Sequence, residues 1–309
     1  MEILLQQLFN GLVLGSMYAL IALGYTMVYG VLNLINFAHG DVLMVGAMVG
    51  WTLLQIIGHV APDLPGIVQL ALAIAGAIPV CIGVSVLIER IAYRRLRNAP
   101  RLAPLITAIG VSILLQTFAM MIWGRNPLPF PQVLPTEPLH ILGALITPTQ
   151  VLLLILATVS MIVLTLLVER TRMGRAMRAV AENPRVAALM GVDSNRVIVF
   201  TFAIGASLAA VAGVMWGANY ASVQFAMGFT PGLKAFSAAV LGGIGNIYGA
   251  MLGGILLGLI ESLGAGYIGD LTGGVLGSHY QDIFAFIVLI LVLTVRPSGI
   301  MGERVADRS

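Results

Sequence analysis

Long apolar stretches separated by short polar ones make up almost the whole chain. An α-helix needs roughly 20 apolar residues to cross a bilayer, and most of the stretches approach that length. The apolar segments are 4–29, 34–57, 66–88, 103–123, 149–168, 197–220, 232–248, 249–268 and 282–295. The pattern predicts an all-α polytopic membrane protein with about eight to nine transmembrane or re-entrant helices. We expect residues 1–309 to form a single transmembrane domain.

The composition excludes a soluble protein. Hydrophobic residues make up 59% of the chain and charged residues only 9%, whereas a soluble domain has about 25% charged residues. The single cysteine, Cys81, lies in an apolar run, which excludes a disulfide framework and predicts a structural thiol. The formal net charge of +3 does not indicate nucleic-acid binding, because the arginines are concentrated in a few polar interruptions.

The distribution of arginine predicts the orientation in the membrane. Arginines gather in two interruptions and in the C-terminal tail, at Arg90, Arg94, Arg95, Arg97 and Arg101, at Arg170, Arg172, Arg175, Arg178, Arg185 and Arg196, and at Arg296, Arg304 and Arg308. The positive-inside rule places these three regions in the cytoplasm. The loop at about 124–148 holds only Arg125 and is therefore external, and its prolines favour an extended, ordered loop. Nine crossings would leave the N-terminus outside; one early re-entrant segment would move it inside.

A polar insert at about 171–192 contains signals for two short cytoplasmic helices. Asn183 is a favourable N-cap, Pro184 suits the first helical position, and Gly191 is a good stop. A preceding helical piece runs from Met173 to Glu182, with Arg178 four residues before Glu182 as a possible ion pair. The next membrane helix would start at Asp193 or Ser194. The insert is thus predicted to be a cytoplasmic helical hairpin.

This hairpin carries apolar and small residues beside its charges, namely Val186, Ala187, Ala188, Leu189 and Met190. A solvated loop has no need of an apolar face, whereas a helix that docks into a groove on another protein does. The alternative is a loop that packs against its own bundle and the lipid headgroups.

Two places inside the apolar sequence predict broken helices. The run Gly242, Gly243, Gly245 and Asn246 is too rich in glycine for a stable straight helix. Asn36, His39 and Asp41 interrupt the sequence near its start and either face a cavity or form a tight turn with Asp41 at a helix N-terminus. Breaks of this kind are tolerated where they are buried in protein or line a cavity, and they often lie beside substrate paths.

Two charged residues, Lys234 and Glu261, fall in otherwise apolar segments and are candidates for function. The more conservative interpretation, which we favour for Lys234, is that its side chain reaches the membrane interface. Glu261 is equally compatible with capping or pairing near a helix end.

The four histidines are scattered, so no metal site is expected. No catalytic constellation and no G-x-x-x-x-G-K-[ST] phosphate loop is present, so any ATP-driven work must come from a partner.

Three long motifs occur in a characteristic order: GSMYALIALGYTMVYGVLNLINFAHGD, RTRMGRAMRAVAENPRVAALMGV and GLKAFSAAVLGGIGNIYGAMLGG. Together they resemble the permeases of bacterial branched-chain amino-acid ABC transporters of the LivH type. The similarity extends from about Gln7 to Gly302, which is nearly the whole chain.

The resemblance implies a permease subunit in the bacterial inner membrane that works with several partners. These are a related LivM-like permease, two cytoplasmic ATPase subunits that use ATP and Mg²⁺, and a periplasmic binding protein that delivers leucine, isoleucine or valine. The chain itself would be no enzyme and bind no cofactor. The coupling contact with the ATPases would fall on Arg175, Arg178, Glu182, Asn183, Pro184, Arg185, Ala187, Ala188 and Gly191. Candidates for the substrate path are Asn36, His39, Asp41, Lys234, Gly242, Gly243, Gly245, Asn246 and Glu261.

Related permeases that carry urea, short-chain amides or other amino acids would share these motifs, because the binding protein sets most of the selectivity. An ion-coupled secondary transporter is a further alternative. It would need a membrane-embedded acid, for which Glu261 and Asp41 are the candidates. A membrane scaffold would have no use for the two helix breaks.

Overall fold

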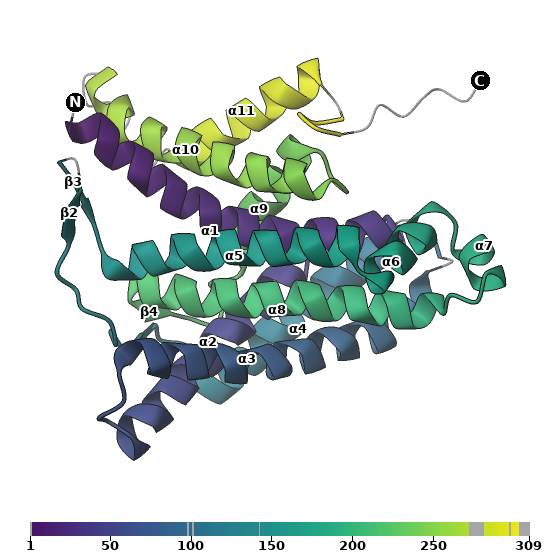
Figure 1. Cartoon of the computed structure of the whole chain (residues 1–309), viewed down its shortest axis with the longest axis horizontal. Coiled ribbons are helices and arrows are strands. Elements are labelled where there is room, and N and C mark those ends of the chain that lie inside the picture. Colours follow the sequence, from purple (N-terminus) through teal and green to yellow (C-terminus); the bar gives the residue numbers. More distant parts are fainter. Residues whose placement is uncertain are drawn as a thin grey trace.

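The protein is a bundle of long helices with four short strands at one end (Figure 1). The computed structural model describes residues 2–97, 99–100, 102–141, 143–271, 281–296 and 298–302. Its helices are α1 (Glu2–Leu32), α2 (His39–Val60), α3 (Gly66–Ile88), α4 (Leu102–Trp123), α5 (Pro148–Arg170), α6 (Arg172–Glu182), α7 (Pro184–Leu189), α8 (Ser194–Tyr220), α9 (Phe229–Gly242), α10 (Ile247–Leu271) and α11 (Gln281–Val295). Each predicted apolar segment corresponds to one helix, and the polar insert supplies α6 and α7.

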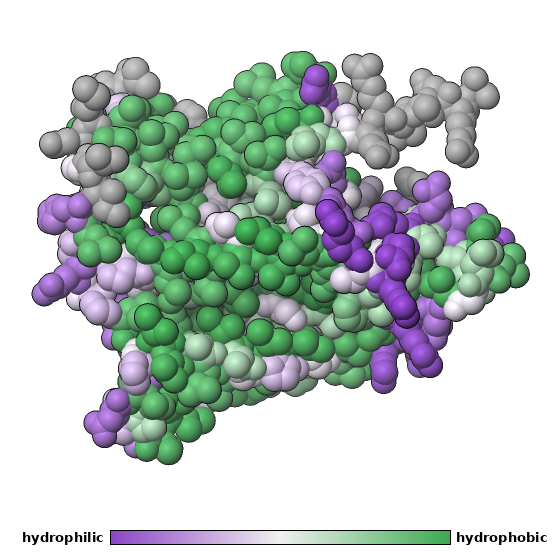
Figure 2. Space-filling view, in the orientation of Figure 1, coloured by the Kyte–Doolittle hydropathy of each residue, from purple (hydrophilic) through white to green (hydrophobic). Residues whose placement is uncertain are grey.

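Within the described residues, seven helices are long and apolar enough to cross a membrane, namely α1 to α5, α8 and α10. The helices α9 and α11 are shorter, with 14 and 15 residues. At 1.5 Å per residue, α9 is about 21 Å long, which is less than the thickness of the hydrocarbon core. The apolar segment 232–248 therefore does not make a full crossing, because α9 begins inside the bundle and ends at Gly242, where the predicted glycine break follows. Figure 2 shows the broad apolar band that the long helices present.

The strands belong to the loops at the end of the bundle opposite α6 and α7. β1 (Leu128–Pro129) pairs antiparallel with β4 (Ser222–Val223), and β2 (Leu139–Ile141) pairs antiparallel with β3 (Ala144–Ile146). Three of these strands lie in the segment 124–148, which confirms the extended, ordered loop. Thr147 and Gln150 form a capping box that stabilises the first turn of α5, the membrane helix that follows this loop.

The two ends of the bundle differ in charge, which orients it. The N-terminal end of α1 lies beside β2 and β3, whereas α6 and α7 lie at the opposite end (Figure 1). The second end carries the arginine-rich segments at 89–97 and 170–196 and is cytoplasmic by the positive-inside rule. The N-terminus is therefore external, which decides between the two alternatives left open by the sequence. Arg101, Arg304 and Arg308 lie outside the described residues.

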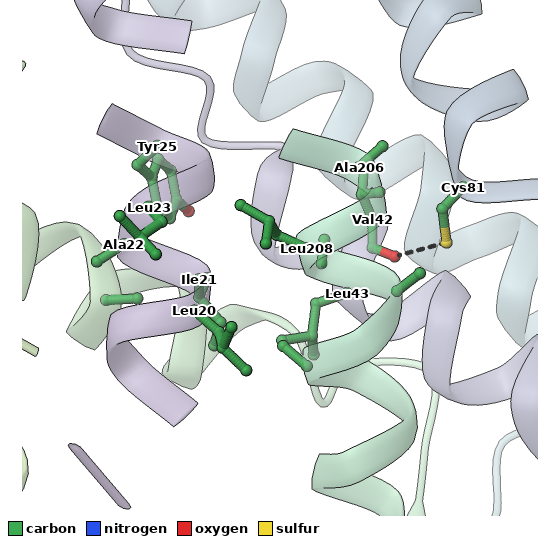
Figure 3. Packing of buried hydrophobic residues seen from close by; sticks show 14 of the residues in the cluster. Leu20, Ile21, Ala22, Leu23, Tyr25, Val42, Leu43, Cys81, Ala206 and Leu208 are labelled. Carbon is green, nitrogen blue, oxygen red and sulfur yellow. Dashed lines mark hydrogen bonds between the residues drawn. The ribbon is translucent and has the colours of Figure 1, made fainter. Parts of the chain in front are cut away.

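The core of the bundle is formed by α1, α2 and α8, with α3 against them. Figure 3 shows Leu20, Leu43 and Leu208 from these three helices in one buried cluster. Cys81 of α3 is fully buried, and its Sγ donates to the Val42 carbonyl at 3.5 Å. The expectation of a structural thiol is confirmed.

Small residues bring the helix backbones together, as expected in a lipid environment. Gly254 and Gly258 of α10 pack against Ala19 and Gly15 of α1. On α8, Gly213 packs against the backbone of α2. Close packing at Gly254 and Gly258 of α10 and at Gly213 of α8 thus contributes to the deep burial of α1 and α2.

Candidate functional site

The cytoplasmic hairpin begins with α6, which is amphipathic and rigidly attached. Thr171 Oγ1 caps its first turn by accepting from the Gly174 N–H at 3.0 Å. Met177 and Val180 are buried and hold one face of the helix against the bundle. Arg175 and Arg178 lie on the exposed face. The cap and the buried face thus fix α6 against the bundle.

The predicted caps of α7 are confirmed. Asn183 Oδ1 accepts from the N–H groups of Arg185 and Val186 at 3.0 and 3.2 Å, and Pro184 is the first residue of the helix. Gly191 ends the turn with a φ of 84°, in the left-handed region that favours glycine. Asp193 then caps α8 by accepting from the N–H groups of Asn195 and Arg196.

The tip of the hairpin exposes apolar side chains to the aqueous side. Leu189 and Met190 are 86% and 80% exposed, and Val186 is also exposed. Figure 2 shows the apolar surface of α7 at the end of the molecule, beyond a group of hydrophilic side chains. The expectation that Ala187 belongs to this exposed surface is wrong, because it packs inward and is only 4% exposed; Ala188 is exposed.

The expected pair between Arg178 and Glu182 does not form among the described residues. Arg178 Nη1 donates instead to the Val168 carbonyl at the end of α5. Glu182 points to solvent at the end of α6. Arg178 thus ties the hairpin to the membrane helix before it.

A cavity of about 880 Å³ lies at the cytoplasmic end, between the hairpin base and the predicted glycine break. Gly245 and Asn246 line it from the break, Arg178 from α6, and Glu169 from α5. Tyr248 closes part of its wall by donating to Glu169 Oε1 at 2.7 Å. The structure therefore brings Arg178 of the hairpin to the same cavity as Gly245 and Asn246, which follow it by 67 and 68 residues in the chain.

The break itself is confirmed between α9 and α10. Gly243 and Gly245 have φ angles of 109° and 96°, which a non-glycine residue rarely adopts. Asn246 then caps α10, because its Oδ1 accepts from the Gly249 N–H at 3.0 Å. Its Nδ2 donates to the Met301 carbonyl at 3.0 Å, so the C-terminal segment 299–302 is bound to the break.

The second predicted break brings two helix N-termini together inside the bundle. α1 ends at Leu32, and the turn 33–38 leads back to α2, which starts at His39 beside Gly24. Gly24 lies eight residues before the end of α1, which is about 12 Å along the helix. Gly40, in the first turn of α2, lies against Gly228, the N-cap of α9. Both α2 and α9 thus begin within the membrane layer.

The three polar candidates at this break are buried and do not lie at an open surface. The Tyr93 hydroxyl donates to Asn36 Oδ1 at 3.0 Å, and Gln116 Nε2 donates to Asp41 Oδ1 at 2.9 Å. The ring of His39 packs edge-on to Tyr25, with 4.9 Å between ring centroids. Asp41 lies in the first turn of α2, as the tight-turn alternative expected.

Lys234 and Glu261 form an ion pair inside the bundle. Lys234 Nζ lies 2.5 Å from Glu261 Oε1, and the two side chains are 7% and 2% exposed. The Tyr18 hydroxyl donates to the other carboxylate oxygen at 3.0 Å. The favoured expectation that Lys234 reaches the interface is wrong, because the carboxylate offers it a buried partner. Glu261 is paired, but it lies in the middle of α10 and not near its end.

Several residues of these clusters were missed in the sequence. Tyr18 and Gln116 each lie in a run of apolar residues, and Tyr93 lies among the arginines of the 90–97 stretch, so none of the three gives a local signal. Glu89, directly before the arginine-rich stretch, was not singled out either; it is fully buried, with Arg94 and Arg97 bound to its carboxylate. A polar residue inside an apolar span is the one general signal that could have found Tyr18 and Gln116.

A helical bundle with span-length apolar helices, two breaks inside it and a capped hairpin at its basic end is a multi-pass membrane protein. Residues 7–293 match the family described as the permease component of branched-chain amino acid transport systems, and the chain belongs to that family.

Curated relatives match over nearly their whole length. The chain is 46% identical over 303 residues to the high-affinity branched-chain amino acid transport system permease protein BraD of Pseudomonas aeruginosa, covering 97% of this chain and 96% of BraD. It is 44% identical over 305 residues to LivH of Escherichia coli K12, with the same coverage. A probable branched-chain amino acid transport permease LivH of Methanocaldococcus jannaschii is 30% identical over 295 residues, 95% of this chain and 91% of that protein. The chain is therefore a multi-pass inner-membrane protein with a transport role.

Proposed function

We propose that the chain is the permease subunit of an ATP-driven importer that moves leucine, isoleucine and valine into the cell. A periplasmic binding protein would deliver the amino acid, and a second, related permease would complete the membrane channel. Two cytoplasmic ATPase subunits would hydrolyse ATP with Mg²⁺. The names of the relatives support the substrate class.

The observation that carries the proposal is the exposed apolar tip of a rigidly capped hairpin. Leu189 and Met190 place apolar surface at the cytoplasmic end, where the lipid cannot cover it. A groove on an ATPase subunit would bury this surface in the helix-in-groove manner. Arg175, Arg185 and Glu182 would form the polar rim of that contact, and Arg178 would pass the movement to α5.

The substrate path is proposed to end in the cavity beside the glycine break. Gly245 and Asn246 line this cavity, and Arg178 of the hairpin lines it as well. A movement of the hairpin would therefore change the cavity directly. The inner break near Asp41 and the pair of Lys234 and Glu261 lie deeper in the bundle and are proposed to support the path during its rearrangement.

The ion-coupled alternative is less well supported by these contacts. Glu261 is held by a lysine and a tyrosine hydroxyl, and Asp41 accepts from Gln116. A carboxylate that binds and releases an ion in each cycle would need access to water, whereas both residues are buried. Importers of urea, amides or other amino acids remain the alternative within the same architecture.

The test is uptake of radiolabelled leucine into proteoliposomes that hold this chain, a related second permease and the two ATPases, with ATP inside and binding protein outside. Accumulation that requires both ATP and binding protein is expected, and collapse of the proton and sodium gradients should leave it unchanged. Uptake that follows an ion gradient without ATP would overturn the proposal. ATPase stimulation only by a binding protein loaded with urea or another solute would overturn the substrate and retain the architecture.

A further inference from the structure

A groove at the cytoplasmic membrane surface lies between α3 and α8, away from the hairpin tip and from the glycine break. It has a volume of about 400 Å³. The two helices run side by side (Figure 1). Met173 of α6 closes one side of the groove at the hairpin base.

Each of the two helices contributes a stripe that changes from apolar to basic in the same direction. On α3 and its extension the lining residues occur every fourth position, as Ile82, Val86, Arg90 and Arg94. On α8 the lining residues are Arg196 at the cytoplasmic end and then Val199, Phe200 and Ala203 toward the membrane interior. Residues three or four apart share one face of a helix, so both stripes face the groove along their length.

The basic end of the groove is built by a network of contacts and is not a set of free surface side chains. Arg97 donates to Asn195 Oδ1 at 2.7 Å, which joins the extension of α3 to the start of α8. The buried Glu89 carboxylate holds Arg94 and Arg97 from beneath. The four arginines here, Arg90, Arg94, Arg97 and Arg196, face two carboxylates, Glu89 and Asp193.

The guanidinium of Arg90 is available to bind an anion in the groove. Among the described residues it makes no ion pair and no side-chain hydrogen bond, and it is exposed toward the groove. A guanidinium in this position can offer a bidentate contact to a phosphate. The neighbouring Arg94 and Arg196 keep part of their surface open, since their side chains are 40% and 86% exposed.

We propose that this groove binds one anionic phospholipid, with the phosphate among Arg90, Arg94 and Arg196 and an acyl chain along Val86, Val199 and Ala203. Basic pockets between membrane helices on the cytoplasmic side are suited to acidic lipid headgroups. The lipid would join the 89–97 segment to α8 and to Met173 at the base of the coupling hairpin. It would therefore stabilise the part of the protein on which the hairpin rests.

The apolar length of the groove favours a lipid over a soluble protein. The stripe from Arg94 back to Ile82 spans 12 residues, or about 18 Å along the helix axis. Its inner half lies in the hydrocarbon layer, which an acidic segment of an ATPase subunit could not occupy without burying its backbone in lipid. A phospholipid matches both the charge at one end and the apolar walls at the other.

The test uses the full chain in detergent, freed of lipid, and native mass spectrometry with added phosphatidylglycerol or phosphatidylcholine. We expect one tightly bound phosphatidylglycerol per chain and weaker binding of phosphatidylcholine. Arg90→Gln and Arg196→Gln should each weaken phosphatidylglycerol binding about fivefold, from about 1 kcal/mol for each basic residue near an anionic lipid surface.

Arg95→Gln is the matched control, because Arg95 lies in the same segment, is exposed and does not line the groove. It should change the affinity for phosphatidylglycerol less than twofold.

A second variant, Val86→Trp, places a large side chain in the apolar part of the groove and leaves every arginine in place. It should weaken phosphatidylglycerol binding although the charge is unchanged. Circular dichroism of each variant checks that the helices are intact.

Four results would overturn the proposal. They are equal binding of the two lipids, an equal effect of Arg90→Gln and Arg95→Gln, displacement of the lipid by millimolar inorganic phosphate, and no effect of Val86→Trp in a folded chain. The third would assign the basic end to a free anion. Loss of the bound lipid when the ATPase subunits assemble would show instead that a protein covers the groove.

Discussion

Lys234 of α9 and Glu261 of α10 form an ion pair inside the membrane layer, with 2.5 Å between Nζ and Oε1. The pair joins the short helix α9, which starts inside the bundle, to the long helix α10, and the Tyr18 hydroxyl adds α1 through the second carboxylate oxygen. Lys234 Nζ also lies 5.8 Å from the Tyr18 ring centroid. The carboxylate of Glu261 therefore joins α1, α9 and α10 through one ion pair and one hydrogen bond.

Removal of one partner of this pair should destabilise the fold more than removal of both. Lys234→Met or Glu261→Gln alone leaves an uncompensated buried charge, at a cost of about 3–5 kcal/mol in the free energy of unfolding. The double variant Lys234→Met/Glu261→Gln removes both charges at nearly constant volume and should recover most of that loss. Thermal unfolding of the purified variants in detergent measures the three values. A double variant as unstable as the sum of the single ones would contradict this account.

The contact between Gly40 and Gly228 should be intolerant of a single methyl group. A Cβ at Gly40 would collide with the Gly228 carbonyl oxygen, and both belong to helix starts that cannot easily separate. Gly40→Ala is expected to lower the free energy of unfolding by about 1–3 kcal/mol through overpacking. Gly83→Ala on α3 is the matched control, because a Cβ there meets open space. Equal stability of both variants in the same unfolding assay would contradict the close contact.

Local signals predicted much of this structure, because they act over a few residues. The N-caps Asn183 and Asp193, the stop at Gly191 and the break near Gly243 all depend on backbone geometry within one turn. Each of the nine apolar segments forms a helix for the same reason, since the bilayer requires internally satisfied backbone groups.

Contacts between distant residues could not be predicted in this way. Lys234 and Glu261 are 27 residues apart, and Tyr18 is 243 residues from Glu261, so nothing in the local sequence signals their contact. Ala187 was expected at the surface with the other apolar and small residues of 186–190, but the fold of the hairpin turns it inward. Arg178 lies four residues before Glu182, yet the free carbonyl at the end of α5 is its actual partner.

The turn after α7 should depend on the left-handed backbone of Gly191. A Cβ at this position meets no other atom, so the cost of a substitution comes from the φ of 84° alone. Gly191→Val should therefore distort the hairpin and lower leucine uptake, whereas Gly191→Asn should retain most of it, because asparagine adopts this conformation more readily. Proteoliposome uptake at matched expression compares the two. An equal loss of leucine uptake in both variants would contradict this account, because it would indicate that any side chain at this position is harmful, whatever its backbone preference.

The number of leucine molecules imported per ATP hydrolysed tests the role of the hairpin most directly. It should be measured for the reconstituted complex with Leu189→Ser/Met190→Ser and, as a control, with Val60→Ser, an equally exposed apolar residue at the opposite end of the bundle. If the apolar tip couples the ATPase to the membrane helices, the tip variant should import much less leucine per ATP while Val60→Ser behaves as the unaltered chain. An unchanged ratio in a fully assembled, well-expressed tip variant would contradict the coupling role.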